Sequence, residues 1–241
     1  MNVIHNWNRW IGTDEAGKGD YFGPLVVAGV YVDAECRETF SDLGITDGKK
    51  LSNRRIQNLA ESMRCDYAQH IVVVERMPAE YNSLYAAFRR RGQNLNHLLA
   101  SLHAEAIQTL ANRVGAKHAL VDKFAKDELI TEQLDQRANN TPHLQRGTAG
   151  GVRATPATLG MEIRQVTKAE RDIAVAASSI IARDTFLTGM ERLSETYQMR
   201  LPRGAYQVVE AGREFVKLHG NDALQHVAKL HFNLTDAVRA L

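Results

Sequence analysis

Cysteine, net charge and long hydrophobic runs are all scarce in this sequence. Its 241 residues include two cysteines, Cys36 and Cys65, without the CxxC or Cys/His spacing of a metal or redox site. We therefore expect both to be reduced and structural, in a cytoplasmic protein. The formal net charge of +2 is too small to indicate a nucleic-acid-binding protein by itself. The apolar run over residues 26–32 is far shorter than the ~20 residues that span a bilayer. Because the N-terminus also lacks the apolar core of a signal peptide, we expect no membrane association.

Strand-like and helix-like segments alternate along the chain, which predicts a single α/β domain with a mixed sheet. Alternating or β-branched patterns predict strands at residues 9–14, 25–33, 71–74, 117–122 and 158–166. Helical spacing covers residues 52–64, with Ser52 as N-cap, 82–91, 94–114, 167–193, and 204–241 with a break at Gly220. The Thr/Gly-rich residues 139–156 predict a mobile surface loop.

A glycine-rich turn, GTDEAGKG at residues 12–19, nearly matches the phosphate-loop pattern GxxxxGK[ST] of nucleotide hydrolases. Gly19 replaces the hydroxyl residue that would hold magnesium, and the following segment is strand-like instead of helical. A nucleotide hydrolase is therefore disfavoured. Asp14 and Glu15 are instead hard oxygen ligands of the kind that Mg²⁺ and Mn²⁺ prefer. Their spacing fits phosphodiester chemistry and, equally, a polar hairpin with solvated acids.

Ordered sequence blocks extend over nearly the whole chain from Ile11 onward. They are GTDEAGKGDYFGPLVVAG (12–29), DGKKL (47–51), YNSL (81–84), NLNHLLA (94–100) with His103, VDKFA (121–125), KAE (168–170), AVAASSIIAR (174–183), LPRG (201–204) and KLHF (229–232). Together these blocks resemble ribonuclease HIII, the sister family of ribonuclease HII among type 2 ribonucleases H. The resemblance implies a ribonuclease H-like fold with a mixed five-stranded sheet flanked by helices and a helical C-terminal region. We expect an N-terminal extension at residues 1–10, a catalytic domain at 11–200, and a C-terminal region at 201–241 packed on that domain.

The resemblance implies four acids around two divalent ions, Mg²⁺ or Mn²⁺. Asp14 and Glu15 match the first pair. Neighbours in a regular strand point to opposite faces, so a shared site requires a bend or a strand end at this point. Asp122 matches the third acid and follows the hydrophobic residues 119–121.

Glu170 matches the fourth acid, in the KAE triplet. It also completes a capping box with Thr167 as N-cap, a structural role that needs no catalysis. Asp172 is the alternative. Asp184 lies roughly 21 Å further along a helix that rises ~1.5 Å per residue, too far to share the site. The small residues at 174–182 favour close packing of this helix on the sheet, which would position Glu170.

The implied activity is endonucleolytic hydrolysis of the RNA strand of RNA–DNA hybrids, leaving 5′-phosphate and 3′-hydroxyl ends. Selecting RNA requires a contact to its 2′-hydroxyl. The backbone of Gly17, Lys18 and Gly19 is the candidate for this contact, by resemblance and because glycine permits close approach. Lys49 and Lys50 are candidates for phosphate contacts.

Two departures from the family pattern qualify this expectation. The family usually has an additional N-terminal substrate-binding domain, whereas about ten residues precede Ile11 here. Either substrate affinity is weaker, or residues 139–156, Trp7 and Trp10 compensate. Ribonuclease HII has Gly-Arg-Gly at the turn and a late tyrosine that recognises single ribonucleotides, whereas this chain has a lysine at the turn and carries Tyr206 one place later.

We therefore expect a preference for stretches of RNA, with a role for Tyr206 at RNA–DNA junctions left open. The alternatives are ribonuclease HII-like activity at single ribonucleotides in DNA, a non-catalytic hybrid-binding module, and a 3′-exonuclease or resolvase. The sequence indicates no obligatory protein partner, and we expect a monomer.

Overall fold

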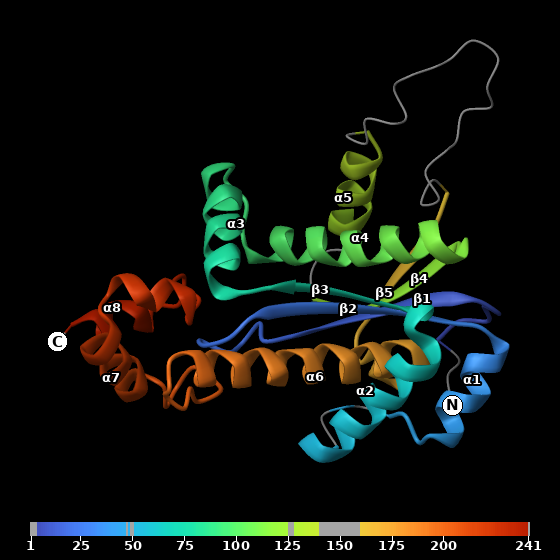
Figure 1. Cartoon of the computed structure of the whole chain (residues 1–241). Coiled ribbons are helices and arrows are strands. Elements are labelled where there is room, and N and C mark those ends of the chain that lie inside the picture. Colours follow the sequence, from blue (N-terminus) through green and yellow to red (C-terminus); the bar gives the residue numbers. More distant parts are fainter. Residues whose placement is uncertain (1–3, 47, 49–50, 125–127, 140–159, 241) are drawn as a thin grey trace, which may run out of the picture. The chain divides into compact units, whose positions relative to one another are not determined.

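The computed structural model describes the chain except residues 1–3, 47, 49–50, 125–127, 140–159 and 241 (Figure 1). The described strands are β1 (Trp10–Ala16), β2 (Leu25–Val32), β3 (Ile71–Arg76), β4 (His118–Asp122) and β5 (Glu162–Val166). The described α-helices are α1 (Ala34–Asp42), α2 (Asn53–Tyr67), α3 (Pro78–Arg90), α4 (Leu95–Val114), α5 (Glu128–Asn139), α6 (Ile173–Thr196), α7 (Val209–His219) and α8 (Leu234–Arg239). Short 3₁₀ helices occupy Ala68–His70, Ala169–Arg171 and Asp222–His226.

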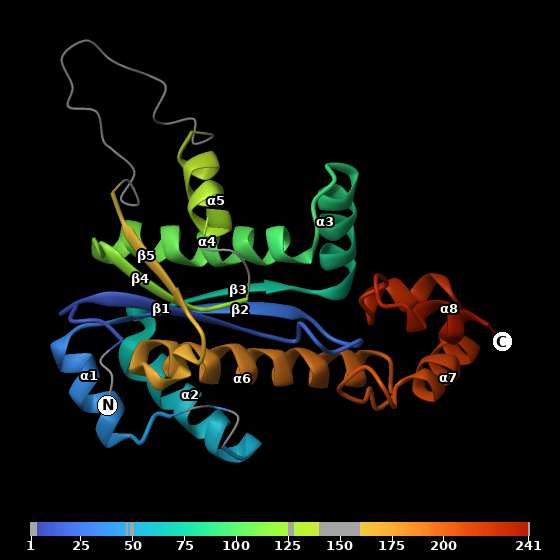
Figure 2. The same ribbon diagram turned by 180° about the vertical axis from the view of Figure 1, so that it is seen from behind.

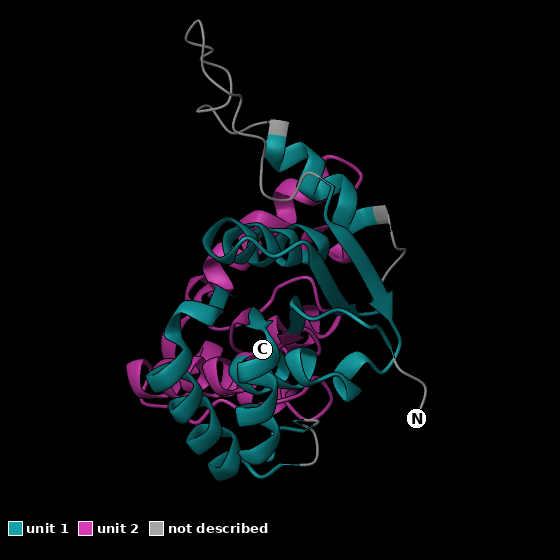
Figure 3. Cartoon of the chain, turned by 90° about the vertical axis from the view of Figure 1, so that its right-hand side faces the viewer, with its two compact units in different colours: residues 1–14, 27–74, 99–181 teal, residues 15–26, 75–98, 182–241 magenta. Residues whose placement is uncertain are grey.

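The chain divides into two compact units, which Figure 3 colours separately. Unit 1 comprises residues 1–14, 27–74 and 99–181, and unit 2 comprises residues 15–26, 75–98 and 182–241. The domain boundaries expected at residues 10 and 200 stay predictions.

A five-stranded mixed sheet in the order β3-β2-β1-β4-β5 forms the centre of unit 1, as the sequence predicts. Strands β1, β4 and β5 are parallel neighbours. Within unit 1, α4 covers one face of the sheet and the first part of α6 covers the other (Figures 1 and 2). Every residue of β2 is buried, as expected for a strand that is covered on both faces.

Helix α6 packs directly on β1 because both elements have small residues where they meet. A Cβ atom on Gly12 would collide with the main chain of Ala174 and Val175. The Ser178 hydroxyl donates a hydrogen bond to the carbonyl oxygen of Gly12 at 2.8 Å. The predicted close packing of this helix on the sheet is therefore confirmed.

By length and composition alone, α6 could also cross a membrane. However, 72% of its most apolar stretch is buried inside the protein. That burial is typical of the core helix of a folded domain.

The predicted start of this long helix at Thr167 is wrong. Lys168 has a φ of 58°, in the left-handed region that a right-handed helix cannot include. The chain then forms the 3₁₀ helix Ala169–Arg171, and α6 begins only at Ile173. The side chain of Asp172 accepts hydrogen bonds from the first turn of α6, so Asp172 takes the capping role predicted for Thr167.

The other predicted elements before residue 167 agree with the described structure to within about four residues. The helix predicted over residues 204–241 is only partly correct, because it divides into α7, the 3₁₀ helix Asp222–His226 and α8, with non-helical residues between them. Ser52 caps α2, as predicted, by accepting a hydrogen bond from the Arg55 amide at 3.3 Å. Gly220 ends α7 with a φ of 85°, which confirms the predicted break. Helices α1 and α5 were not predicted. The cap of α1 is Asp33, whose carboxylate accepts a hydrogen bond from the Cys36 amide at 3.0 Å.

Unit 2 contains α3, the later part of α6, α7 and α8 (Figure 3). Helices α7 and α8 pack closely at Gly212, where there is no room for a side chain. A Cβ atom on Gly212 would lie 2.7 Å from the side chain of Val238. An ion pair of 2.8 Å joins Arg192 in α6 to Glu75 at the end of β3.

Candidate active site

The parallel pairing of β1 and β4 places two of the predicted acids side by side. Gly12 pairs with Leu120 and Thr13 with Val121, so the next residues in register are Asp14 and Asp122. Paired strands lie ~4.8 Å apart. Because side chains alternate along a strand, Asp14 points to the same face as Gly12, which is the face covered by α6.

Glu170 lies on the turn that is hydrogen-bonded to Asp122. The Asp122 carboxylate accepts a hydrogen bond from the main-chain amide of Ala169 at 3.0 Å, and Glu170 is the next residue. Glu170 also lines a pocket of about 580 Å³. Its buried Oε2 atom has no hydrogen-bond partner within the part of the chain that the structure describes. A buried carboxylate oxygen without a donor is costly, and a bound cation would remove that cost.

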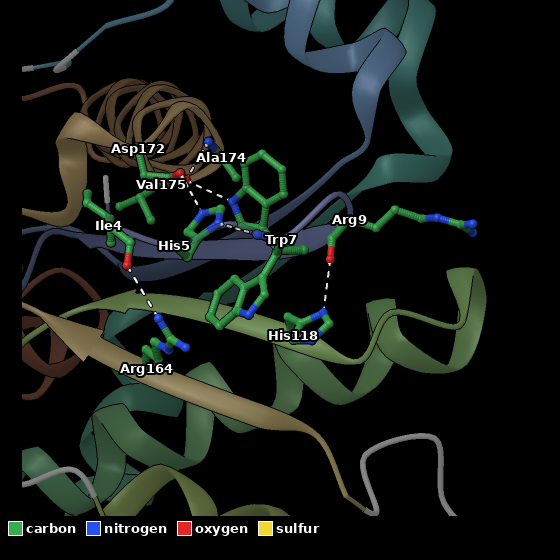
Figure 4. A network of polar contacts seen from close by, with 10 residues as sticks. Ile4, His5, Trp7, Arg9, His118, Arg164, Asp172, Ala174 and Val175 are labelled. Carbon is green, nitrogen blue, oxygen red and sulfur yellow. Dashed lines mark hydrogen bonds and ion pairs between the residues drawn. The ribbon is translucent and has the colours of Figure 1, made fainter. Parts of the chain in front are cut away.

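Asp172, the alternative fourth acid, has both oxygens engaged (Figure 4). Its Oδ1 accepts hydrogen bonds from the Trp10 indole at 2.9 Å and from the amides of Ala174 and Val175 at 2.9 and 3.3 Å. Its Oδ2 lies 3.0 Å from Nε2 of His5. Asp172 is 8% exposed, so both oxygens already have protein partners in a buried setting.

Glu15 directly follows Asp14 within β1. Strand β1 extends to Ala16, and in a regular strand neighbouring side chains point to opposite faces. The Glu15 carboxylate lies 3.4 Å from the ammonium of Lys18. The expectation that a bend or a strand end lets Glu15 share the site with Asp14 stays a prediction, and β1 ends one residue after Glu15, at Ala16.

Among the described residues, no three His, Cys, Asp or Glu side chains lie close enough together to form a metal site by themselves. Carboxylates repel one another at short range, and each is stabilised by nearby donors. Asp122 and Glu15 have such donors in Ala169 and Lys18. The residues nevertheless fit a divalent cation, because Asp14, Asp122 and the turn of Glu170 provide hard oxygen ligands at one end of the sheet.

The turn at residues 17–19 contains two glycines, and their surroundings differ. Gly17 has a φ of 84°, and a Cβ atom there would collide with Pro24 and with the ring of Phe186. Gly19 has no atom within 4 Å of its Cβ position and no left-handed φ. Packing therefore explains Gly17 but not Gly19, whose backbone is open to another molecule.

A buried lysine that the sequence analysis missed holds the loop after this turn. The Lys229 ammonium donates hydrogen bonds to the carbonyl oxygens of Asp20 at 2.8 Å and Gly23 at 2.7 Å, with Phe22 at 3.4 Å. Burial lowers the pKa of Lys229 to about 7, while the Asp20 charge acts in the opposite direction. The signal in the sequence was a lysine inside the otherwise apolar segment 227–230.

The segment that carries Lys229 is itself fixed by the YNSL block. The Asn82 amide donates to the Ala228 carbonyl at 2.9 Å and accepts from the Leu230 amide at 2.9 Å. The Tyr81 hydroxyl lies 3.0 Å from Nδ1 of His231. Burial, with the charge of Lys229, lowers the pKa of His231 to about 4.

The same loop also fixes the LPRG block. The Asp20 carboxylate accepts a hydrogen bond from the Gly204 amide at 2.7 Å, and the Tyr21 amide donates to the Gly204 carbonyl at 2.9 Å. Tyr206, two residues further on, is 97% exposed. Unit 2 therefore joins four separate sequence blocks around residues 20–23.

Not all of the predicted substrate contacts can be compared with the structure. Lys49, Lys50 and most of residues 139–156 lie outside the described residues. Of the alternatives left open for substrate affinity, compensation by Trp7 and Trp10 is disfavoured, because Trp10 is fully buried and Trp7 is 7% exposed. Both rings belong to the interior of unit 1.

Comparison with known proteins identifies the family. The family model described as Ribonuclease HII matches residues 11–235. Ribonuclease HIII of Protochlamydia amoebophila is 37% identical over 229 residues, which cover 95% of this chain and 67% of that protein. Ribonuclease HIII of Chlamydia muridarum is 38% identical, over 96% of this chain and 70% of that protein.

Solved structures agree. The structure of Bst-RNase HIII in complex with Mn²⁺ is similar, with a TM-score of 0.76 and 30% identity over 96% of this chain and 69% of that one. RNase H3 of Aquifex aeolicus has a TM-score of 0.66 and 27% identity, over 94% and 73% of the two chains. This chain belongs to the ribonuclease HII family of RNase H hydrolases, together with the relatives named ribonuclease HIII.

Proposed function

We propose that this protein is an endonuclease that hydrolyses the RNA strand of RNA–DNA hybrids with two divalent ions, Mg²⁺ or Mn²⁺. The observation that carries the proposal is the register of β1 and β4, which brings Asp14 beside Asp122 on the face next to the turn of Glu170. A relative of this chain, Bst-RNase HIII, has a structure in complex with Mn²⁺.

Asp14, Asp122 and Glu170 are the proposed ligands, with Glu15 as the fourth acid of the set. Divalent ions held by these residues would supply activation of the attacking water and stabilisation of the departing 3′-oxygen, a reaction that would leave 5′-phosphate and 3′-hydroxyl ends. The bond from Ala169 holds Asp122 and the turn of Glu170 together. The unpartnered Glu170 oxygen supports Glu170 over Asp172, whose oxygens are taken up by other donors.

The proposed contact to the 2′-hydroxyl is the backbone at Gly17, Lys18 and Gly19. The open surroundings of Gly19 support this role, because a ribose could approach its main chain closely. Lys49 and Lys50 are proposed phosphate contacts. The exposed ring of Tyr206 is available to stack on a base at an RNA–DNA junction.

The test is cleavage of three labelled duplexes, with Mg²⁺ and with Mn²⁺: a uniform hybrid, a DNA duplex with one ribonucleotide, and plain DNA. We expect internal cuts in the uniform hybrid, and either none or far fewer in the other two duplexes. Preferred cutting at the single ribonucleotide would favour ribonuclease HII-like specificity, and end-dependent products would indicate an exonuclease.

The Asp14→Asn variant tests the site. It should lose hydrolysis by at least ~100-fold while binding the hybrid with nearly unchanged affinity, because the neutral amide is a poor ligand for hard cations. Binding is measured by fluorescence anisotropy in Ca²⁺. Near-normal turnover by this variant would refute the proposed site, and binding without cleavage by the wild type would leave a hybrid-binding module.

A further inference from the structure

Residues 4–10 contact the turn of Glu170 through one buried carboxylate, that of Asp172. The His5 and Asp172 side chains are 2% and 7% exposed, and their Nε2 and Oδ2 atoms lie 3.0 Å apart. The indole of Trp10 donates to the other oxygen of Asp172 at 2.9 Å. The same pocket of about 580 Å³ is lined by His5, Glu170 and Asp172.

The hydrogen bonds around His5 fix its tautomer. The amide of Trp7 donates to Nδ1 of His5 at 3.1 Å, so this nitrogen is an acceptor (Figure 4). The ring hydrogen therefore lies on Nε2, from which it is donated to Asp172. His5 and Trp10 together supply one side-chain donor to each oxygen of this carboxylate.

Asp172 in turn determines where the turn of Glu170 ends and where α6 begins. Its carboxylate caps α6, and its amide donates to the Ala169 carbonyl at 2.8 Å, which closes the turn around Glu170. The amide of Ala169 is bound to Asp122 on the other side. Glu170 thus lies between two fixed points, one of which depends on the N-terminal segment.

The N-terminal segment is anchored on the strand that carries Asp122. The ring of Trp7 stacks between those of His5 and His118, at centroid distances of 4.4 and 4.8 Å. The guanidinium of Arg164 lies 4.8 Å from the Trp7 ring. His118 is the first residue of β4 and Asp122 is the last, so the segment connects β4 with the turn of Glu170.

We propose that His5 and Trp10 are positioning residues that hold Glu170, through Asp172, in place to bind a divalent cation. The proposal rests on the proposed function, because it assumes that Glu170 is a ligand. Residues that orient metal ligands through hydrogen bonds typically contribute 10–100-fold to metal affinity or activity. A side chain that merely stabilised the fold would leave metal affinity unchanged in the folded protein.

The experiment compares three variants of the full chain: His5→Leu removes the donor, Trp10→Phe removes the indole N–H and keeps a ring, and His5→Gln retains a donor of similar reach. Mn²⁺ affinity is measured by titration calorimetry without nucleic acid. The Mn²⁺ concentration for half-maximal cleavage and the KM for the hybrid are measured in parallel. We expect His5→Leu and Trp10→Phe to weaken Mn²⁺ binding ~10-fold or more. KM at saturating Mn²⁺ should stay unchanged, and His5→Gln should restore most of the affinity.

The matched control is His70→Leu, which removes an imidazole 3.0 Å from the Cys36 sulfur and far along the chain from the turn of Glu170. It should lower the melting temperature without changing Mn²⁺ affinity. Wild-type Mn²⁺ affinity in His5→Leu and Trp10→Phe, with Asp14→Asn still defective, would overturn this proposal alone. Undiminished Mn²⁺ binding and cleavage by Asp14→Asn would instead overturn the proposed function.

Discussion

Replacing Lys229 with methionine is expected to change how the stability of the protein depends on pH. Methionine has a similar length but carries neither a charge nor a hydrogen-bond donor. In the folded protein Lys229 is fully buried, and burial lowers its pKa from 10.5 to about 7. In the unfolded chain the ammonium is solvated and its pKa returns to ~10.4. Between these two values the unfolded chain binds a proton that the folded protein lacks.

The magnitude follows from the width of this pH window. Where the unfolded chain binds one more proton, the free energy of unfolding rises by ~1.4 kcal/mol per pH unit. From pH 7 to pH 10 the wild type should therefore gain ~4 kcal/mol relative to Lys229→Met. The variant also leaves the carbonyls of Asp20 and Gly23 without this donor, at ~1–3 kcal/mol each. That cost does not depend on pH. The way in which the difference in free energy of unfolding between wild type and variant changes with pH therefore reports only the titration of Lys229.

The assay is urea unfolding followed by circular dichroism at pH 7, 8, 9 and 10. Lys217→Met is the matched control, because Lys217 is an exposed lysine in α7 of the same unit. The free energy of unfolding of the wild type should increase with pH relative to that of Lys229→Met. The free energy of unfolding of Lys217→Met should follow the same pH dependence as the wild type. Parallel curves for Lys229→Met would refute the reasoning, because the three carbonyls would then offset the burial of the charge completely.

Three further predictions concern the turn and its surroundings. Gly17→Ala should destabilise the protein by ~1–3 kcal/mol because of the positive φ and the crowded Cβ position. Gly19→Ala should keep the wild-type melting temperature and weaken hybrid binding. Equal effects of the two variants on melting temperature and on hybrid binding would contradict this distinction. Lys18→Ala should reduce the slope of log affinity against log salt by ~0.9, if the ammonium contacts one phosphate; an unchanged slope would argue against that contact. The lowered pKa of His231 means that the unfolded chain binds the extra proton between pH 4 and pH 6.5, so stability should fall as the pH drops through this range. His231→Gln should flatten that fall in thermal melts, and an equally steep fall would refute the assignment.

The sequence by itself determined the strands that carry the acids and the character of the helix beside them. Asp14 and Asp122 follow short apolar segments whose patterns predict strands, and β1 and β4 are where those patterns place them. The small residues after Ile173 predict close packing on the sheet, which Gly12 confirms. These features depend on residues that are close together in the sequence, so the sequence pattern alone predicts them.

Local patterns did not reveal the buried lysine. Lys229 stands in an apolar segment and matched only as part of a family block. Its role depends on carbonyl groups about 206 to 209 positions away, which only the folded chain brings to its ammonium. No periodicity or spacing near residue 229 records those partners.

Only the tertiary structure decided which acid begins α6. Thr167 and Glu170 form a locally sound capping box, so the sequence favoured an earlier helix start than the structure has. Asp172 is the cap because His5 and Trp10, 167 and 162 positions away, donate to its carboxylate in the interior of unit 1. A buried carboxylate requires such donors. This requirement outweighs the local capping preference of Thr167 and Glu170.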